Sequence, residues 1–253
     1  MSEGSIGRIR GARCIVALGA LGLAVVALAP RPAVADRAAT DRAATDRAAA
    51  DAARIDWAAG WVTAGGTGVA DRHAPSPAVA LGTSRRGAED AARRRIAATL
   101  GALPLAAGGS VADRLADPAI KARIDAAVAA AIAIAAEPET DGSWHVTLAV
   151  PIEAIRLALV APRALPAAGD AGPPVVIVDG VTGTPAVGWT IGGAAAATLW
   201  LPDAGALPAW AKDAPHVQAA ARPAGGAASP AGSIAIDGTT GSPATLYVLV
   251  PRA

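Results

Sequence analysis

The chain has 253 residues, of which 53% are hydrophobic, yet only 3% are aromatic and none is Phe. Alanine supplies much of the hydrophobic fraction, and because its side chain is a single methyl group, the composition does not imply a large core. Basic and acidic residues nearly balance, at 22 against 21. This balance excludes a basic nucleic-acid-binding protein and an acidic solvating tail.

The first 35 residues have the pattern of a secretory signal. Arginines precede the uncharged run Cys14–Ala29, and the small-x-small triplet Ala33-Val34-Ala35 follows it. The run is shorter than the roughly 20 residues that a membrane-spanning helix needs. We therefore expect a signal peptide over residues 1–35 that is cleaved between Ala35 and Asp36.

Cleavage at this site would remove Cys14, the one cysteine of the chain. The mature protein would then have neither disulfides nor thiolate metal ligands. Cys14 stands at the start of the apolar run, whereas a lipoprotein signal has its lipid-attachment Cys at the end. No later apolar run reaches spanning length without Gly, Pro or a charge. We therefore expect an exported protein, periplasmic or secreted, whose mature form does not span a membrane.

Residues 36–54 form a pentad repeat, with Asp-Arg-Ala-Ala-Thr at Asp36 and again at Asp41. Less regular copies begin at Asp46 and Asp51. A period of five matches neither a helix face nor a heptad, and the repeat has no apolar side chain larger than Ala with which to dock. The pattern predicts a partly helical spacer before the first domain.

Two helices are predicted in the segment that follows the spacer. Apolar residues recur at helical spacing from Arg85 to Leu103, and Thr83 or Ser84 supplies the cap. Asp117-Pro118 combines a capping carboxylate with a first-turn proline, and Ile or Val then recurs every four residues. We therefore expect one helix over residues 85–103 and another that begins at this proline.

Strands are predicted on both sides of these helices. An apolar stretch ends in Gly65-Gly66-Thr67-Gly68, which is typical of a strand that runs into a glycine-rich turn. Residues 132–136 and 144–150 alternate in hydropathy on either side of Asp141-Gly142, as in a β-hairpin. Pro151 should end the second strand of this hairpin, and a short helix should follow.

These elements predict an α+β domain over residues 55–160, in which a small antiparallel sheet has two helices packed on one face. A Pro/Gly linker is expected over residues 161–174. Residues 175–253 contain short β-like runs separated by Gly and Pro, which indicates a β-rich C-terminal domain. The runs are Val175–Val178, Thr198–Leu201, Ser233–Ile236 and Leu246–Val250.

The sequence contains no motif that defines a reaction or a cofactor. Gly65–Gly68 suggests a phosphate loop, but the chain has no Gly-Lys pair, and Asp71 stands where a dinucleotide fingerprint needs Gly. No serine stands in Gly-x-Ser-x-Gly, and His73, His145 and His216 are isolated from one another. His145 alternates with the apolar residues of the hairpin and is expected on its solvent face. We therefore expect no catalytic residue, no cofactor, and no bound metal or nucleotide.

Two further patterns have ordinary structural explanations. Residues 179–186 and 237–244 share Asp-Gly and Thr-Gly, so Asp179 and Asp237 are expected to be turn formers rather than calcium ligands or paired catalytic carboxylates. Arginines cluster on and just before the first predicted helix, with acidic residues interleaved. This pattern favours a solvated, ion-paired face over a membrane- or polyanion-binding patch.

Three segments carry a resemblance to a known family: Trp61–Ala70, the Ala-rich stretch Ala88–Leu100, and Asp141-Gly142 through Val150-Pro151. Over about residues 55–159 the chain resembles a bacterial envelope family known from a twenty-kilodalton outer-membrane lipoprotein. It is also similar to the N-terminal domain of flagellar assembly protein T. The resemblance implies a small α+β domain with a non-enzymatic role in envelope or surface assembly, and it transfers no binding residues.

The sequence therefore predicts an exported, non-enzymatic protein that binds envelope or surface proteins. The alternative is a secreted enzyme or carbohydrate-binding protein whose site is built from scattered residues. In that alternative Trp189, Trp200 and Trp210 would serve as sugar platforms. Because the chain has no Phe, these tryptophans are also the largest side chains with which to fill a core, and we favour the core role.

Overall fold

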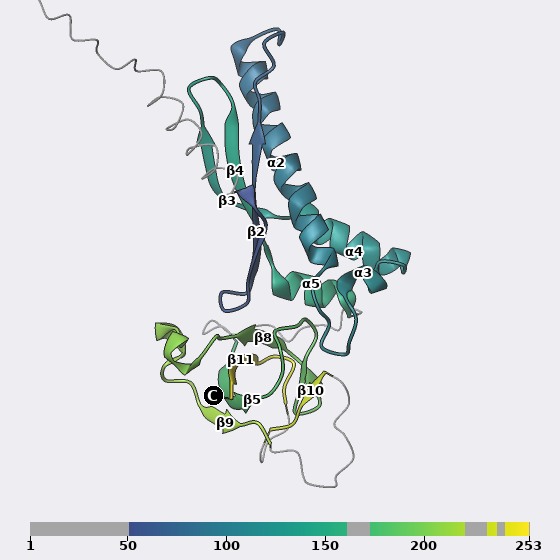
Figure 1. Cartoon of the computed structure of the whole chain (residues 1–253), viewed down its shortest axis with the longest axis vertical. Helices are drawn as coiled ribbons and strands as arrows, with labels where there is room; N and C mark the ends of the chain where they lie inside the picture. The colour runs from purple at the N-terminus through teal and green to yellow at the C-terminus, as the bar shows by residue number, and fades with distance from the viewer. Residues whose placement is uncertain (1–50, 161–172, 221–231, 237–240, 253) are drawn as a thin grey trace, which may run out of the picture. The chain divides into compact units, whose positions relative to one another are not determined.

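The computed structural model describes residues 51–160, 173–220, 232–236 and 241–252 (Figure 1). Within these ranges the protein is a mixed α+β structure. A four-stranded antiparallel sheet packs with helix α2, and a β-rich C-terminal part with parallel and mixed sheets follows. The predicted fold class is confirmed. The expected cleavage site between Ala35 and Asp36 lies outside the described residues, as does most of the expected linker.

The antiparallel sheet has the strand order β1-β2-β4-β3. The predicted hairpin is confirmed, because β3 and β4 pair around a turn in which Asp141 Oδ1 accepts hydrogen bonds from the backbone N–H and the hydroxyl of Ser143. Gly142 has a φ of +83° in this turn, a conformation that favours glycine. The strands are β1 Arg54–Asp56, β2 Trp61–Gly68, β3 Ile132–Pro138 and β4 Trp144–Pro151.

The glycine-rich stretch Gly65–Gly68 lies inside β2, so the prediction that it forms a turn after the strand is wrong. Its glycines allow a helix to approach the sheet closely. A Cβ atom at Gly66 would overlap the backbone carbonyl of Ala88, and one at Gly68 would overlap that of Ser84. Small side chains on α2 face these glycines, so the helix packs almost directly on the strand backbone.

Helix α2 spans Pro77–Gly101 and begins earlier than predicted. Its cap is Ser76, whose side chain accepts a hydrogen bond from the backbone N–H of Val79, and Pro77 occupies the first turn. Thr83 and Ser84, the predicted caps, lie within the helix. The hydroxyl of Ser84 donates to backbone carbonyls, including that of Gly142 in the hairpin turn.

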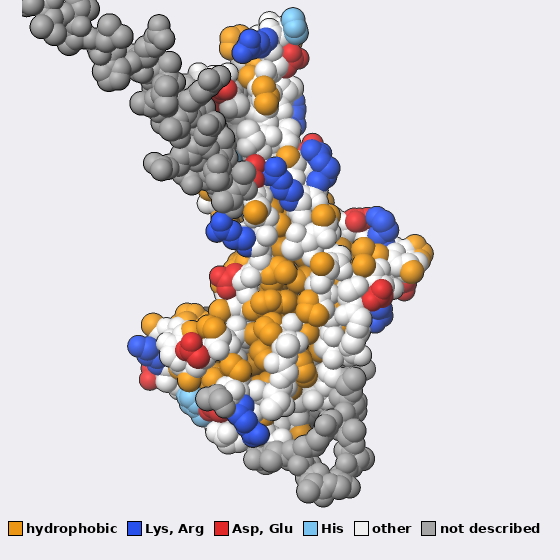
Figure 2. Space-filling view, in the orientation of Figure 1, with side chains coloured by type: hydrophobic (Ala, Val, Ile, Leu, Met, Phe, Trp, Pro, Cys, Tyr) orange, Lys and Arg blue, Asp and Glu red, His pale blue; other side chains and the backbone are white. Residues whose placement is uncertain are grey.

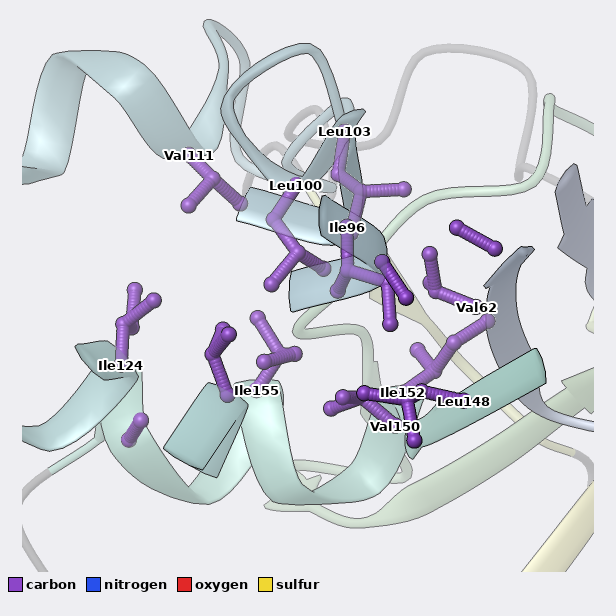
Figure 3. Packing of buried hydrophobic residues seen from close by; sticks show 14 of the residues in the cluster. Val62, Ile96, Leu100, Leu103, Val111, Ile124, Leu148, Val150, Ile152 and Ile155 are labelled. Atoms are coloured by element: carbon purple, nitrogen blue, oxygen red, sulfur yellow. The ribbon is translucent and has the colours of Figure 1, made fainter. Parts of the chain in front are cut away.

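Three shorter helices complete the first core. α3 spans Val111–Arg114, α4 spans Pro118–Ala129 and α5 spans Ile152–Leu159. The prediction that a helix begins at Pro118 is confirmed, and Asp117 caps it by accepting from the N–H of Ala119 at 2.8 Å. Figure 3 shows how aliphatic side chains from α2, from the shorter helices and from the sheet point toward one another. They include Val62, Ile96, Leu100, Leu148, Val150 and Ile155.

The C-terminal part contains a parallel four-stranded sheet with the order β8-β11-β5-β9 and a small mixed sheet with the order β10-β6-β7. Each of the four predicted β-like runs overlaps a strand. The parallel strands are β5 Val175–Val181, β8 Ala197–Trp200, β9 His216–Gln218 and β11 Leu246–Pro251. The others are β6 Thr190–Ile191, β7 Ala194–Ala195 and β10 Ser233–Ile234.

Backbone hydrogen bonds connect the first sheet and its helices to the β-rich part. Trp200 N donates to Trp57 O at 3.0 Å. Val187 exchanges bonds with the segment after α2, since Val187 N donates to Pro104 O and Ala106 N donates to Val187 O, both at 2.9 Å. Trp57 packs against the hydrophobic clusters of both regions.

Candidate interaction surfaces

The outer strand β3 exposes large aliphatic side chains. Ile132 is 52% exposed and Ile134 is 59% exposed, although both lie within the strand. No charged residue lies between Ile132 and Ala136, and Pro138 stands at the end of the strand. Natural edge strands are usually protected by charges, prolines or bulges. β3 has a bulge between Ala133 and Ala135 but no charge on its aliphatic stretch.

The backbone of β3 also has hydrogen-bonding groups at its outer edge for which the described residues supply no partner. Ile152 N donates to Gly60 O at 2.8 Å, which fixes the alternation of the β2–β4 ladder. Hydrogen-bonded and non-hydrogen-bonded residue pairs alternate along an antiparallel ladder. Val146 and Gly66 lie an even number of pairs from Ile152 and Gly60, so they are a hydrogen-bonded pair and the N–H and C=O of Val146 point toward β2. The partner of Val146 on β3 is Ala136, whose N–H and C=O therefore point away from β4.

The opposite outer strand, β1, borders a pocket of about 450 Å³. One wall is formed by β1 and the turn after it, and the other by the end of β8 with neighbouring prolines. Aliphatic, aromatic and proline side chains dominate the lining, and Arg54 and Asp56 provide its charges. The lining residues are Arg54, Ile55, Asp56, Trp57, Ala58, Pro185, Trp200, Leu201 and Pro202.

Asp51, the first residue of the last pentad, is buried at 8% exposure and belongs to a polar cluster. Its carboxylate lies 2.8 Å from Arg95 Nη1 and 3.3 Å from His145 Nδ1. Arg95 Nη1 also donates to Gly65 O at 2.6 Å, so the guanidinium spans the edge of β2. We expected the pentad repeat to have no side chain with which to dock, because it has no large apolar residue. This expectation is wrong at Asp51, whose carboxylate docks through polar contacts.

The three histidines lie in different environments. His145 is on the sheet face opposite Trp144, as alternation predicts, but the prediction that it faces solvent is wrong, because its side chain is only 14% exposed beside Asp51. His216 Nδ1 lies 2.8 Å from Asp179 Oδ2, and the β5–β9 pairing brings them together. His73 is exposed in the loop before α2.

The pair of His216 and Asp179 is one that sequence reasoning missed, because 37 positions separate the two residues. No sequence signal pointed to the pair, because Asp179 was expected in a turn and His216 lies in none of the predicted β-like runs. A metal site needs more donors than this pair supplies. In the described ranges, no group of three or more His, Cys, Asp or Glu side chains is arranged to hold a metal ion.

Two of the three C-terminal tryptophans belong to the core. Trp189 and Trp200 are buried at 9% and 3% exposure, and their ring centroids are 5.6 Å apart with the planes tilted by 47°. The core role that we favoured is confirmed for these two. They do not form a coplanar, exposed platform. Trp210 is 57% exposed.

The arginines of α2 form ion pairs along the helix surface. Arg85 and Arg93 both lie 3.3 Å from carboxylate oxygens of Glu89, and Arg93 also pairs with Asp90 at 3.1 Å. Figure 2 shows basic and acidic side chains interspersed over this part of the surface. The predicted ion-paired face is confirmed for these residues. The prediction that Asp179 forms a turn is wrong, because Asp179 lies within β5 and pairs with Gln218 of β9, although Gly180 after it has a φ of +73°. Asp237 lies outside the described residues.

No protein-family model matches the chain, and neither curated proteins nor solved structures include a significant match to it. The resemblance to the envelope lipoprotein family therefore stays a prediction. Among the helices of the described ranges, none combines the length and the hydropathy needed to cross a bilayer.

Proposed function

We propose that this is an exported, non-enzymatic protein of the cell envelope, periplasmic or secreted, which binds another envelope or surface protein through the outer edge of β3. The observation that carries the proposal is the exposure of Ile132 and Ile134 on the aliphatic stretch of an edge strand, ahead of the strand's charged residue Glu137. An extended segment of a partner would pair with the outward backbone groups of β3 and cover both isoleucines.

A protein partner fits this edge better than a small ligand. The outward N–H and C=O of Ala136 are spaced for a neighbouring strand, and aliphatic side chains beside them supply apolar area. The signal-peptide pattern of residues 1–35 supports export, and the resemblance to the envelope family supports a role in assembly.

The alternative, a secreted enzyme or carbohydrate-binding protein, has less support. Sugar platforms need exposed aromatic faces, and Trp189 and Trp200 are buried. Trp210 remains as an exposed ring, but no second ring of this set lies exposed beside it. We therefore favour protein binding.

Site-specific photo-crosslinking tests the proposal. A photoreactive residue at position 136 of the full chain, expressed in its source cells, should give a discrete adduct with one envelope protein. The same probe at Ala98, an exposed alanine on α2, is the matched control and should give none. Ile134→Lys should suppress the adduct while leaving the thermal unfolding midpoint within a few degrees. Equal adducts at both positions, or an adduct insensitive to Ile134→Lys, would contradict the proposal.

A further inference from the structure

Strand β3 presents an acidic and an aliphatic side chain on one face of the antiparallel sheet. Residues that pair across a ladder share a face, and so do residues an even number of positions apart along a strand. Glu137 pairs with His145 of β4, and Ile132 pairs with Ala149 of the same strand. Glu137 and Ile132 therefore project from one face, which is the face opposite Trp144.

The backbone N–H and C=O of Glu137 point toward β4. Glu139 N donates to Ser143 O at 2.8 Å, so these two residues form a hydrogen-bonded pair next to the turn. Because bonded and non-bonded pairs alternate, Glu137 and His145 are a hydrogen-bonded pair as well. Toward a strand added at the outer edge, Glu137 therefore occupies a non-hydrogen-bonded position, where facing side chains come closest. One side chain of the added strand would lie directly against its carboxylate.

The carboxylate of Glu137 has no counter-charge among the described residues. The side chain is exposed, and within these residues it forms no ion pair. Basic groups of the neighbouring elements are engaged elsewhere. On the same face, His145 Nδ1 and Arg95 Nη1 lie 3.3 and 2.8 Å from the carboxylate of Asp51. On the other face, Arg85 of α2 lies over an aromatic ring. An added strand therefore meets a carboxylate that is still to be neutralised.

On the basis of the function proposed above, we propose that the partner's extended segment runs antiparallel to β3 and places Lys or Arg opposite Glu137. Aliphatic residues follow at alternate positions of the segment and cover Ile132. Cross-strand pairs of opposite charge stabilise a ladder, and like charges destabilise it. All pairings within this four-stranded sheet are antiparallel, and antiparallel ladders are slightly more stable than parallel ones. The edge therefore selects a basic segment over an acidic one.

Pro138 limits the pairing and thereby sets the position of the basic residue within the partner segment. It follows Glu137 and has no backbone N–H, so at this residue β3 offers an added strand a carbonyl but no donor. The pairing therefore extends from Glu137 back toward Ile132. Because the added strand runs in the opposite direction, its basic residue precedes its aliphatic residues.

Fluorescence anisotropy with two labelled synthetic peptides tests the proposal on the purified full chain. Both peptides alternate Thr and Ile, and they differ only in one residue before the first Ile, which is Lys in one and Glu in the other. The wild-type chain should bind the Lys peptide about fivefold more tightly, and Glu137→Lys should reverse the preference by a similar factor. Asp125→Lys, which changes an exposed acid on α4, is the matched control and should keep the wild-type preference.

The reversal also controls for misfolding, because a damaged Glu137→Lys chain would not gain affinity for the Glu peptide. Equal affinity of the wild-type chain for both peptides would overturn the proposal. The absence of measurable binding to either peptide would overturn it as well.

Photo-crosslinking in cells separates this proposal from the function on which it rests. Glu137→Lys should reduce the adduct formed from position 136 about fivefold, and Asp125→Lys should leave it unchanged. An adduct that is lost with Ile134→Lys but retained with Glu137→Lys would overturn the basic residue and leave the edge as the binding site. A wild-type chain that forms no adduct would overturn both.

Discussion

Arg95 and Asp51 are bound across the edge of β2, with Nη1 of the arginine 2.8 Å from Oδ2 of the aspartate. The same nitrogen donates a hydrogen bond to the backbone carbonyl oxygen of Gly65. Arg95 therefore connects helix α2 to strand β2 through Gly65 and to the last pentad through Asp51.

Replacing Arg95 with Ala should lower the free energy of unfolding by about 1–2 kcal/mol. The substitution leaves a mostly buried carboxylate without its cation and a strand carbonyl without its donor. Arg95 itself is 43% exposed, which keeps the expected loss at the low end for such a network. Urea denaturation measures it, and Arg94→Ala, next to it and exposed, should change stability by less than about 0.5 kcal/mol. Equal losses would mean that the pair contributes nothing specific.

Gly68→Ala should destabilise the protein by about 3 kcal/mol, because the new Cβ atom would overlap the carbonyl of Ser84 and force α2 away from the sheet. Gly82→Ala, within α2, is the contrasting substitution, because a Cβ atom added at Gly82 would have no neighbouring atom within 4 Å. It should stabilise by about 0.5–1 kcal/mol through helix propensity. Thermal or urea unfolding compares the two, and a neutral Gly68→Ala would refute the close packing.

Proline substitutions in β3 distinguish its two edges. Ala136→Pro should be tolerated, because the N–H that it removes points away from β4. Ala135→Pro should cost about 3 kcal/mol or more, because Ala135 pairs with Thr147 in a hydrogen-bonded position of the ladder. Circular dichroism during urea unfolding of both variants checks the prediction. The reverse order would show that the hydrogen-bonding phase is shifted by one residue.

The short helix α3 should become less stable in acid. The backbone N–H of Ser110 donates to Asp113 Oδ2 at 2.7 Å, and the Ser110 hydroxyl donates to the same oxygen, which lowers the pKa of Asp113 below its usual 3.8. A carboxyl group whose pKa is lower in the folded than in the unfolded state stabilises the fold at any pH above its unfolded-state pKa. This stabilisation is lost as the pH falls through the folded-state pKa. NMR titration of Asp113 measures the shift, and Ser110→Ala should move the pKa back toward 3.8.

The exported chain should begin at Asp36. The arginines, the apolar run and the Ala33-Val34-Ala35 triplet stand in the order that signal peptidase requires. Amino-terminal sequencing of protein from the envelope or the medium decides the point. A chain that retains Met1 in a membrane fraction would show that the run is an anchor.

Periodicity and capping chemistry were enough to predict most elements of the first sheet and its helices. Asp117-Pro118 and Asp141-Gly142 each carry a local chemical signal, and both mark element boundaries correctly. Ser76 was missed as the cap of α2 because the first turns of that helix are mostly exposed, so they lack the apolar spacing that marked residues 85–103.

Contacts between distant residues could not be predicted in the same way. Nothing near Gly66 in the sequence shows that Ala88 lies against it, and glycine in a strand resembles glycine in a turn. The pairing of His216 with Asp179 depends on β9 lying beside β5, and the pairing of Asp51 with Arg95 depends on α2 crossing β2. The outward direction of the Ala136 backbone groups on β3 could be determined only from the strand order and the hydrogen-bonding pattern of the sheet.

The anchoring of Asp51 also bears on how the gene can change. The preceding pentads begin with the same residue, at Asp36, Asp41 and Asp46, and each continues Arg-Ala-Ala. Loss or gain of one whole unit upstream leaves Asp51, Arg95 and His145 untouched. A change in the number of pentads would therefore alter the length of chain before Asp51 in steps of five residues, without altering the residues of this polar cluster.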